Sequence, residues 1–212
     1  MVGAALMLAL ASCFREQDMG NPGAVGDGET FVKFSIWLPG NSAPTTRALT
    51  ESNENHVQTI DILIFEQGGA WVYNTGCSGS DIATDGGDPL KKSFTIKMRQ
   101  GSYDMVMLAN ARSIVSGMNM SGQSKSVVLA ALTAQMPPGG KWITDPAATD
   151  YKAIPMWGDV GNVTINSSTQ NLDAQNIRLT RMLARVDVQI DPAVPNFTLT
   201  SVDVYNYNTM GA

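Results

Sequence analysis

Residues 31–38 alternate between apolar and polar side chains, and this pattern constrains the fold more than any other segment. The apolar positions share one face: Val32, Phe34, Ile36 and Leu38. Lys33 and Ser35 fall on the opposite face, and Pro39 ends the segment. A period of two is typical of a β-strand with one buried face. We therefore predict a strand whose even-numbered side chains enter a hydrophobic core.

Further short apolar segments follow, separated by turn residues, and they predict an all-β protein. The segment 59–65 is apolar almost throughout, which is typical of a strand buried on both faces. Only residues 126–136 have helical spacing, and Pro137 follows them. Many short strands with turns between them favour a β-sandwich with one short helix. The other predicted strands are 71–73, 93–99, 103–109, 154–158, 160–165, 176–190 and 197–207.

The charge balance excludes one class of partner. The 212-residue chain has 14 Lys and Arg against 19 Asp and Glu, a net charge of −5. Nucleic-acid binding needs a basic face, and the basic residues of this chain do not cluster along the sequence. We therefore expect no nucleic-acid partner.

The chain begins with an apolar run that ends in Leu10-Ala11-Ser12-Cys13. An apolar segment with small residues before a cysteine is the layout of a bacterial lipoprotein signal, although no Lys or Arg precedes it. The run is too short to span a bilayer as a helix. We predict a signal peptide over 1–12, lipidation of Cys13, a flexible tether over 13–30 and one β-sandwich domain over 31–212. The alternative is a buried N-terminal helix that ends in a cysteine.

An enzymatic function is not supported, and we expect no catalytic residue, metal site or cofactor. The only histidine is His56, in a polar loop, and Cys77 lies in a turn-like stretch with no base close in sequence. Three acidic residues could bind calcium, but they fit no EF-hand spacing, and a plain acidic loop is the favoured interpretation. They are Asp81, Asp85 and Asp88.

Two side chains outside the predicted core have possible functions. Arg47 is the only basic residue between Lys33 and Lys91, and its loop is polar and without periodicity. An arginine in a flexible loop is a good protease substrate; the alternative is an ordinary surface arginine. Trp37 lies on the polar face of its strand and could contact a carbohydrate, with packing as the alternative.

The order of these features resembles the fimbrillins, the type V pilins of Bacteroidales-type bacteria. The lipoprotein signal, the first strand and the Thr46-Arg47-Ala48 loop precede the apolar strand 60–65 and its glycine turn. The segments 154–158, 179–188 and 197–206 continue the same order. The resemblance covers nearly the whole chain but only the N-terminal half of a typical fimbrillin.

The resemblance implies a transthyretin-like β-sandwich and an assembly mechanism. In that family, lipidated precursors reach the outer membrane, an Arg-specific protease cuts after the loop arginine, and the first strand leaves. The groove then accepts a strand from another pilin subunit. By position, the cut falls between Arg47 and Ala48. The departing strand is the groove plug that carries Val32, Phe34, Ile36 and Leu38.

The chain also departs from the family pattern. A typical fimbrillin continues into a second β domain that donates a strand, and this chain stops at Ala212. We expect either a fragment or a subunit that accepts a strand only, at an end or an anchor. The expected function is a structural, accessory or anchor component of a cell-surface fimbrium. The alternative is a surface lipoprotein that binds glycans or host proteins.

Overall fold

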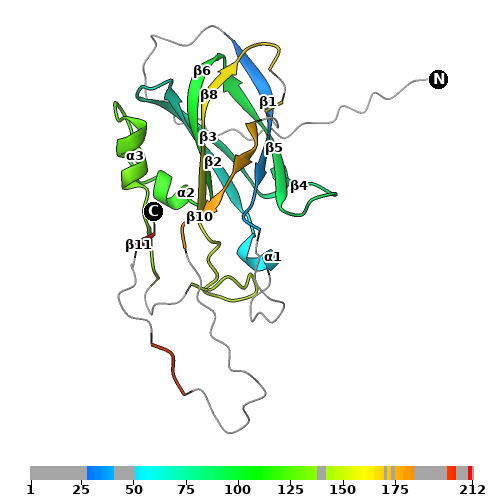
Figure 1. The fold of residues 1–212 in the computed structure, drawn as a ribbon, viewed down its shortest axis with the longest axis vertical. Helices are drawn as coiled ribbons and strands as arrows, with labels where there is room; N and C mark the ends of the chain where they lie inside the picture. Colours follow the sequence, from blue (N-terminus) through cyan, green and yellow to red (C-terminus); the bar gives the residue numbers. More distant parts are fainter. Residues whose placement is uncertain are drawn as a thin grey trace, which may run out of the picture.

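Two β-sheets lie face to face and form most of the molecule (Figure 1). The structure is a computed structural model of the chain. It describes residues 28–40, 51–137, 142–169, 171–172, 175–183, 200–203 and 210–211. The two sheets confirm the predicted all-β sandwich.

The smaller sheet has four strands in the order β4-β5-β1-β9, and the larger has five in the order β10-β8-β6-β2-β3. The four strands are β1 (Glu29–Trp37), β4 (Ala83–Thr84), β5 (Lys91–Arg99) and β9 (Ile177–Arg178). The five are β2 (Thr59–Glu66), β3 (Trp71–Ser78), β6 (Gly101–Ala109), β8 (Met156–Ile165) and β10 (Thr180–Arg181). The remaining elements are β7 (Ala134–Gln135), paired with β11 (Met210–Gly211), the helices α1 (Glu51–Glu54), α2 (Arg112–Val115) and α3 (Lys125–Ala131), and the 3-10 turn η1 (Gly79–Asp81).

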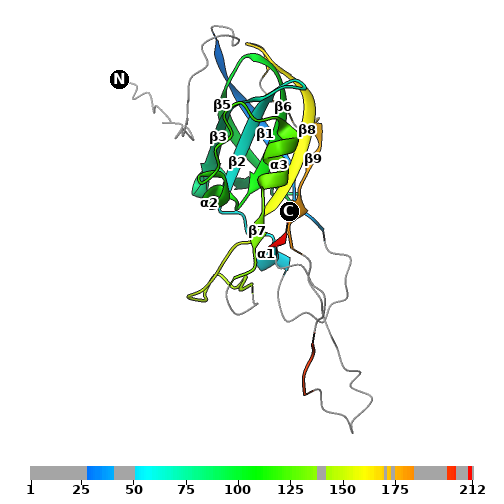
Figure 2. The same cartoon turned by 90° about the vertical axis from the view of Figure 1, so that its left-hand side faces the viewer.

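The five-stranded sheet is buried on both faces, and β2 shows why its sequence is continuously apolar. Ile60, Ile62 and Ile64 enter the core between the two sheets. Leu63 and Phe65 point the other way, into a second apolar cluster beneath α2 and α3. Figure 2 looks onto this covered side, with α3 in front of the sheet. The predicted burial of both faces of this strand is confirmed.

Several predicted boundaries were wrong. The strand predicted at 71–73 extends to Ser78, because β3 pairs with β2 over its whole length. The two strands predicted over 154–165 form one, β8, which stays paired with β6 across a register shift. Helix α3 ends at Ala131, since residues 134–135 pair with β11 instead of continuing the helix. Two shorter helices, α1 and α2, were not predicted.

The segment from β9 to β10 links the two sheets along one side of the sandwich. Ile177 and Arg178 pair with β1 in the small sheet, and Thr180 and Arg181 pair with β8 in the large sheet. Gly158 makes the close crossing possible, because a Cβ there would lie only 2.4 Å from the Arg178 carbonyl oxygen. The chain predicted as one long strand over 176–190 is therefore two short strands within its described part, 176–183.

Candidate functional site

Strand β1 is bound strongly along one edge and weakly along the other. All nine of its residues pair with β5, from Glu29 opposite Arg99 to Trp37 opposite Lys91. On its other edge the parallel ladder with β9 covers only Ile36 and Trp37. One isolated bridge, from Lys33 to Asn171, adds to it. Within the part of the chain that the structure describes, backbone pairing thus holds β1 mainly through β5.

The inward side chains of β1 are fully enclosed. Val32, Phe34 and Ile36 have no exposed surface, and Leu38 is 4% exposed. Phe34 stacks on Phe94 of β5, with the ring centroids 5.6 Å apart. The four side chains belong to the core between the sheets, so departure of β1 would open a groove along that core. Their role as a removable plug stays a prediction.

The outward face of β1 is more open, although Ser35 on this face is fully buried. Phe31 is 53% exposed, Lys33 is exposed and Trp37 is half-buried. The Lys91 ammonium lies 5.2 Å from the centre of the Trp37 ring, and it also forms an ion pair with Asp85 at 3.6 Å. Lys91 thus lies over the Trp37 ring.

A polar cluster closes the end of β1 nearest Pro39. The Arg181 Nη2 atom donates to the Pro39 carbonyl oxygen at 3.2 Å and to Asn55 Oδ1 at 2.6 Å. It lies 3.7 Å from Glu54 Oε2. The Asn55 side-chain nitrogen also donates to the Pro39 carbonyl, at 3.3 Å. The side chains of Arg181 and Glu54 are 15% and 7% exposed, so these contacts are largely shielded from water.

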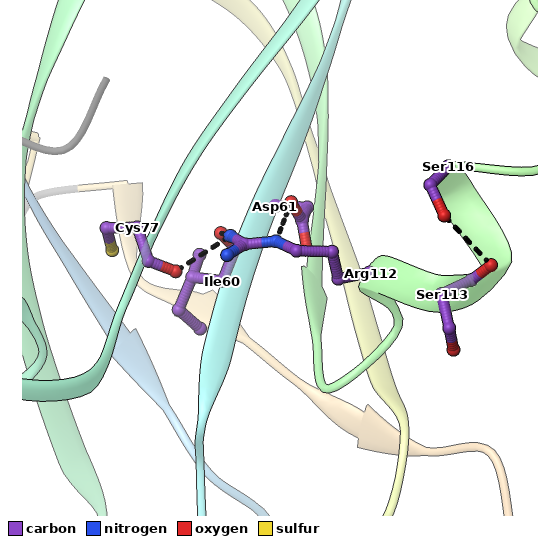
Figure 3. A network of polar contacts seen from close by, with 6 residues as sticks. All are labelled: Ile60, Asp61, Cys77, Arg112, Ser113 and Ser116. Carbon is purple, nitrogen blue, oxygen red and sulfur yellow. Dashed lines mark hydrogen bonds and ion pairs between the residues drawn. The ribbon is translucent and has the colours of Figure 1, made fainter. Parts of the chain in front are cut away.

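A second polar network lies on the large sheet, where α2 meets β2 and β3 (Figure 3). Arg112 of α2 donates from Nε to Asp61 Oδ1 at 3.0 Å, and from Nη2 to the carbonyl oxygens of Ile60 and Cys77. Gly76 lies opposite Asp61, and a Cβ there would lie 2.3 Å from the Ile60 carbonyl oxygen. This network fixes α2 on the sheet.

His56 and Cys77 lie in different environments. His56 is half-buried, and its Nδ1 lies 2.5 Å from the Tyr151 hydroxyl oxygen. Burial raises the pKa of Tyr151 above its usual value. Cys77 is 3% exposed and sits in β3, so the predicted turn was wrong. Within the described part of the chain, no group of three or more His, Cys, Asp or Glu side chains could hold a metal ion.

The acidic loop before β5 is held by its own backbone. Asp85 Oδ1 accepts a hydrogen bond from the Gly87 amide, and Asp88 Oδ1 accepts one from the Leu90 amide. The Gly87 amide, with the nearby Lys91 ammonium, holds the pKa of Asp85 below its usual range. This geometry fits the plain acidic loop of the sequence interpretation better than a calcium site.

The other predicted site residues lie outside the described residues. These are Cys13, the proposed lipidation site, and Arg47 and Ala48, the proposed cleavage site. In the ranges that the structure describes, no helix is both long and apolar enough to cross a membrane.

Sequence reasoning identified β1 but missed both arginine networks. Asp61 was a usable signal, because a carboxylate within the apolar run of β2 needs a basic partner. No signal identified Arg181 as the contact of Glu54 and Asn55, since Arg181 and Asn55 are 126 positions apart.

Comparison with solved structures finds fimbrial proteins of low sequence identity. The tip fimbrial protein Mfa3 of Porphyromonas gingivalis, with a C-terminal truncation, aligns with a TM-score of 0.47 and 17% identity over 73% of this chain and 49% of that one. A fimbrilin of Porphyromonas gingivalis W83 aligns with a TM-score of 0.41 and 16% identity, over 71% and 40%. A putative polysaccharide-binding protein of Bacteroides thetaiotaomicron aligns with a TM-score of 0.41 and 13% identity, over 71% and 47%. The chain therefore spans less than half the length of each of these proteins.

Sequence comparison gives a family but no individual relative. No curated protein matches the chain. The family model of the fimbrillin-A associated anchor proteins Mfa1 and Mfa2 matches residues 22–212, nearly the full length of the sequence. The resemblance to fimbrillins is thus confirmed, and the chain belongs to the family of fimbrillin-A associated anchor proteins Mfa1 and Mfa2.

Proposed function

We propose that this protein is an accessory or anchor subunit of a cell-surface fimbrium, and that β1 holds the place of a strand from another subunit. The observation that supports it is the position of β1, with four enclosed side chains but, among the described residues, a full backbone ladder on only one edge. A strand held in this way can be exchanged for another of the same pattern without refolding the large sheet.

The energetics favour exchange over simple loss of β1. Burial of an aliphatic or aromatic side chain contributes about 2 kcal/mol, so the four inward side chains of β1 contribute roughly 8 kcal/mol together. Loss of β1 would also leave the inner edge of β5 unpaired. An incoming strand would restore both, which is β-augmentation. While the chain is intact, β1 stays at high effective concentration and excludes the competitor.

Cleavage between Arg47 and Ala48 by an Arg-specific protease would remove that advantage. After the cut, β1 and the body are separate chains, and a strand from another pilin subunit can compete. Digestion with a trypsin-like protease should give a new N-terminus at Ala48. The Arg47→Ala variant should not give this product. Arg47 left intact while other sites are cut would contradict the proposal.

Strand uptake tests the central claim. A labelled peptide with the sequence of residues 29–40 is added in excess to the cut and the uncut chain, and bound label is measured after size-exclusion chromatography. Uptake by the cut chain alone is expected. A control peptide with Asp at the positions of Phe34 and Ile36 should not bind, because its carboxylates would enter the core. No uptake after cutting would overturn the strand-exchange function.

The lipid anchor is a separate part of the proposal. Acylation of Cys13 would place the protein at the outer membrane, with residues 13–30 as its tether. The Cys13→Ala variant should move from the membrane fraction to the soluble fraction of cells. Unchanged membrane partition would remove Cys13 from the proposal.

A second candidate function is the binding of a glycan or host protein. A cleft of about 640 Å³ lies beside the end of β1, and its lining includes His56, Asp88, Leu90 and Lys92. This volume lies within the range of small-ligand sites. Saturable glycan binding by the uncut chain, without peptide uptake by the cut chain, would favour this function over strand exchange.

A further inference from the structure

We propose that Arg181, together with Glu54 and Asn55, forms a latch that retains β1 after the chain has been cut between residues 41 and 50. This inference rests on the proposed function, because a latch matters only for a strand that can leave. It predicts that β1 leaves the cut chain slowly, and that loss of the latch contacts speeds its release.

The latch contacts both sides of the segment where the cut is proposed. Pro39 precedes residues 41–50 and belongs to the part of the chain that would leave with β1. Glu54 and Asn55 follow the segment and belong to the body. Arg181 lies on β10, far from both in the sequence, and its Nη2 atom contacts both sides. A cut between 41 and 50 therefore breaks the covalent link but leaves this noncovalent one.

The position of the latch makes it the first barrier to peeling. A cut strand frays from its new end, and counted from residues 41–50 the first described contacts of β1 are those around Pro39. Beyond them, the Leu38 amide donates to the Leu90 carbonyl oxygen at 2.8 Å, and the Leu179 amide donates to the Trp37 carbonyl oxygen at 2.8 Å. The ladder with β5 cannot open from this end until the Pro39 carbonyl has left Arg181 and Asn55.

Burial makes this end stronger than the other. The side chains of Glu54 and Arg181 are 7% and 15% exposed. At the opposite end of β1, the ion pair of Glu29 and Lys97 joins side chains that are 38% and 34% exposed. Solvent and salt screen the exposed pair more than the buried one. The end of β1 nearest the proposed cut is therefore the better held of the two.

The test measures the rate at which β1 leaves the cut chain. A recognition sequence for a site-specific protease is inserted after Arg47 in the full chain, which is then cut. Unlabelled peptide 29–40 in excess prevents rebinding, and the N-terminal fragment that remains with the body is followed by size exclusion and mass spectrometry. The variants are Arg181→Met, which removes the charge and keeps the aliphatic bulk, and Glu54→Gln. The matched control is Arg178→Met, three residues away and exposed.

Arg181→Met should speed release by about tenfold or more, the factor expected from loss of one charge-assisted hydrogen bond. Glu54→Gln should give a smaller increase, and Arg178→Met none. Hydrogen exchange on the uncut chains provides a second readout, in which Arg181→Met should lower protection of the β1 amides near Trp37 more than that of the β6 amides.

The outcomes separate the latch from the proposed function. If β1 leaves the wild type and Arg181→Met at the same rate, with unchanged exchange at β1, the latch is overturned and the removable strand stands. If β1 stays bound in every variant despite excess peptide, both are overturned. Equal loss of protection in β1 and β6 would show that Arg181 supports the whole fold, and would also overturn the latch.

Discussion

Strands β1 and β6 both place side chains in the core between the sheets, but they are held differently. Strand β6 pairs along nearly its whole length with β2 on one edge and with β8 on the other. Strand β1 pairs along its whole length with β5 but over only two residues with β9. From Met105 to Ala109 the side chains of β6 are buried on both faces of the large sheet, whereas β1 leaves Phe31 and Lys33 exposed on its outward face.

This difference shows that the burial of a strand and its integration into the fold, through pairing on both edges, are separate properties. Burial of the inward face of β1 supplies hydrophobic free energy that any strand with the same apolar pattern could supply. The integration of β6 depends on two long ladders and on the helices that cover its outer face. A replaceable element can thus lie in the core of a protein, provided that its contacts are made mainly by one face and one edge.

The largest effect should come from matched core truncations in the two strands. Phe34→Ala in β1 and Leu108→Ala in β6 should each lower the free energy of unfolding of the uncut chain by about 3–5 kcal/mol, because both side chains are fully buried. After the cut at residues 41–50, wild-type peptide 29–40 should restore the urea midpoint of the Phe34→Ala chain, since the peptide supplies the missing ring. The same peptide should not restore the urea midpoint of the Leu108→Ala chain.

A peptide that itself carries the Phe34→Ala change is the control, and it should restore neither chain. Equal rescue of both variants, or of neither, would show that β1 and β6 do not differ in the way proposed.

A smaller effect is expected at the Arg112 network of the large sheet. Arg112→Met would leave the Asp61 carboxylate, on a residue only 6% exposed, without its guanidinium. Removing one partner of a shielded ion pair leaves the other charge buried and unpaired, which is strongly destabilising. Because Arg112 is partly exposed, we expect the free energy of unfolding, measured with urea, to fall by about 2–3 kcal/mol. Adding Asp61→Asn to this variant should recover part of the loss. Arg178→Met, at an exposed site, should change stability by less than about 0.5 kcal/mol.

The strands and the polar clusters of the molecule differ in how far the sequence predicts them. The alternation of 31–38 and the apolar run of 59–65 gave the correct strands and faces, because burial imposes its period directly on the residues. The Gly76-Cys77-Ser78 stretch was misjudged as a turn, since its strand state depends on pairing with β2 and not on local propensity. The Arg181 cluster was not predictable, because the crossing of β9 to β10 between the sheets brings distant residues together.

The smallest effect concerns Asp104, which links the turn between β2 and β3 to strand β8. Asp104 Oδ2 accepts a hydrogen bond from the Gly68 amide, and Oδ1 accepts one from the Asn162 amide, both at 3.0 Å. These two bonds hold the pKa of Asp104 below its usual value of 3.8. Because the folded pKa is lowered, the stabilisation is complete above the unfolded value and is lost as the pH falls through the folded pKa.

Asp104→Asn should therefore cost about 1 kcal/mol near neutral pH, a low figure because solvent screens the carboxylate. The difference between the variant and the wild type should stay constant from pH 7 to about pH 5 and shrink in more acidic solution, where the wild-type carboxyl takes up its proton. Urea unfolding across this range measures it. A difference that grows as the pH falls would show that Asp104 is not held as a carboxylate by the two amides. A shift in β1 release would show that this part of the large sheet is coupled to the replaceable strand.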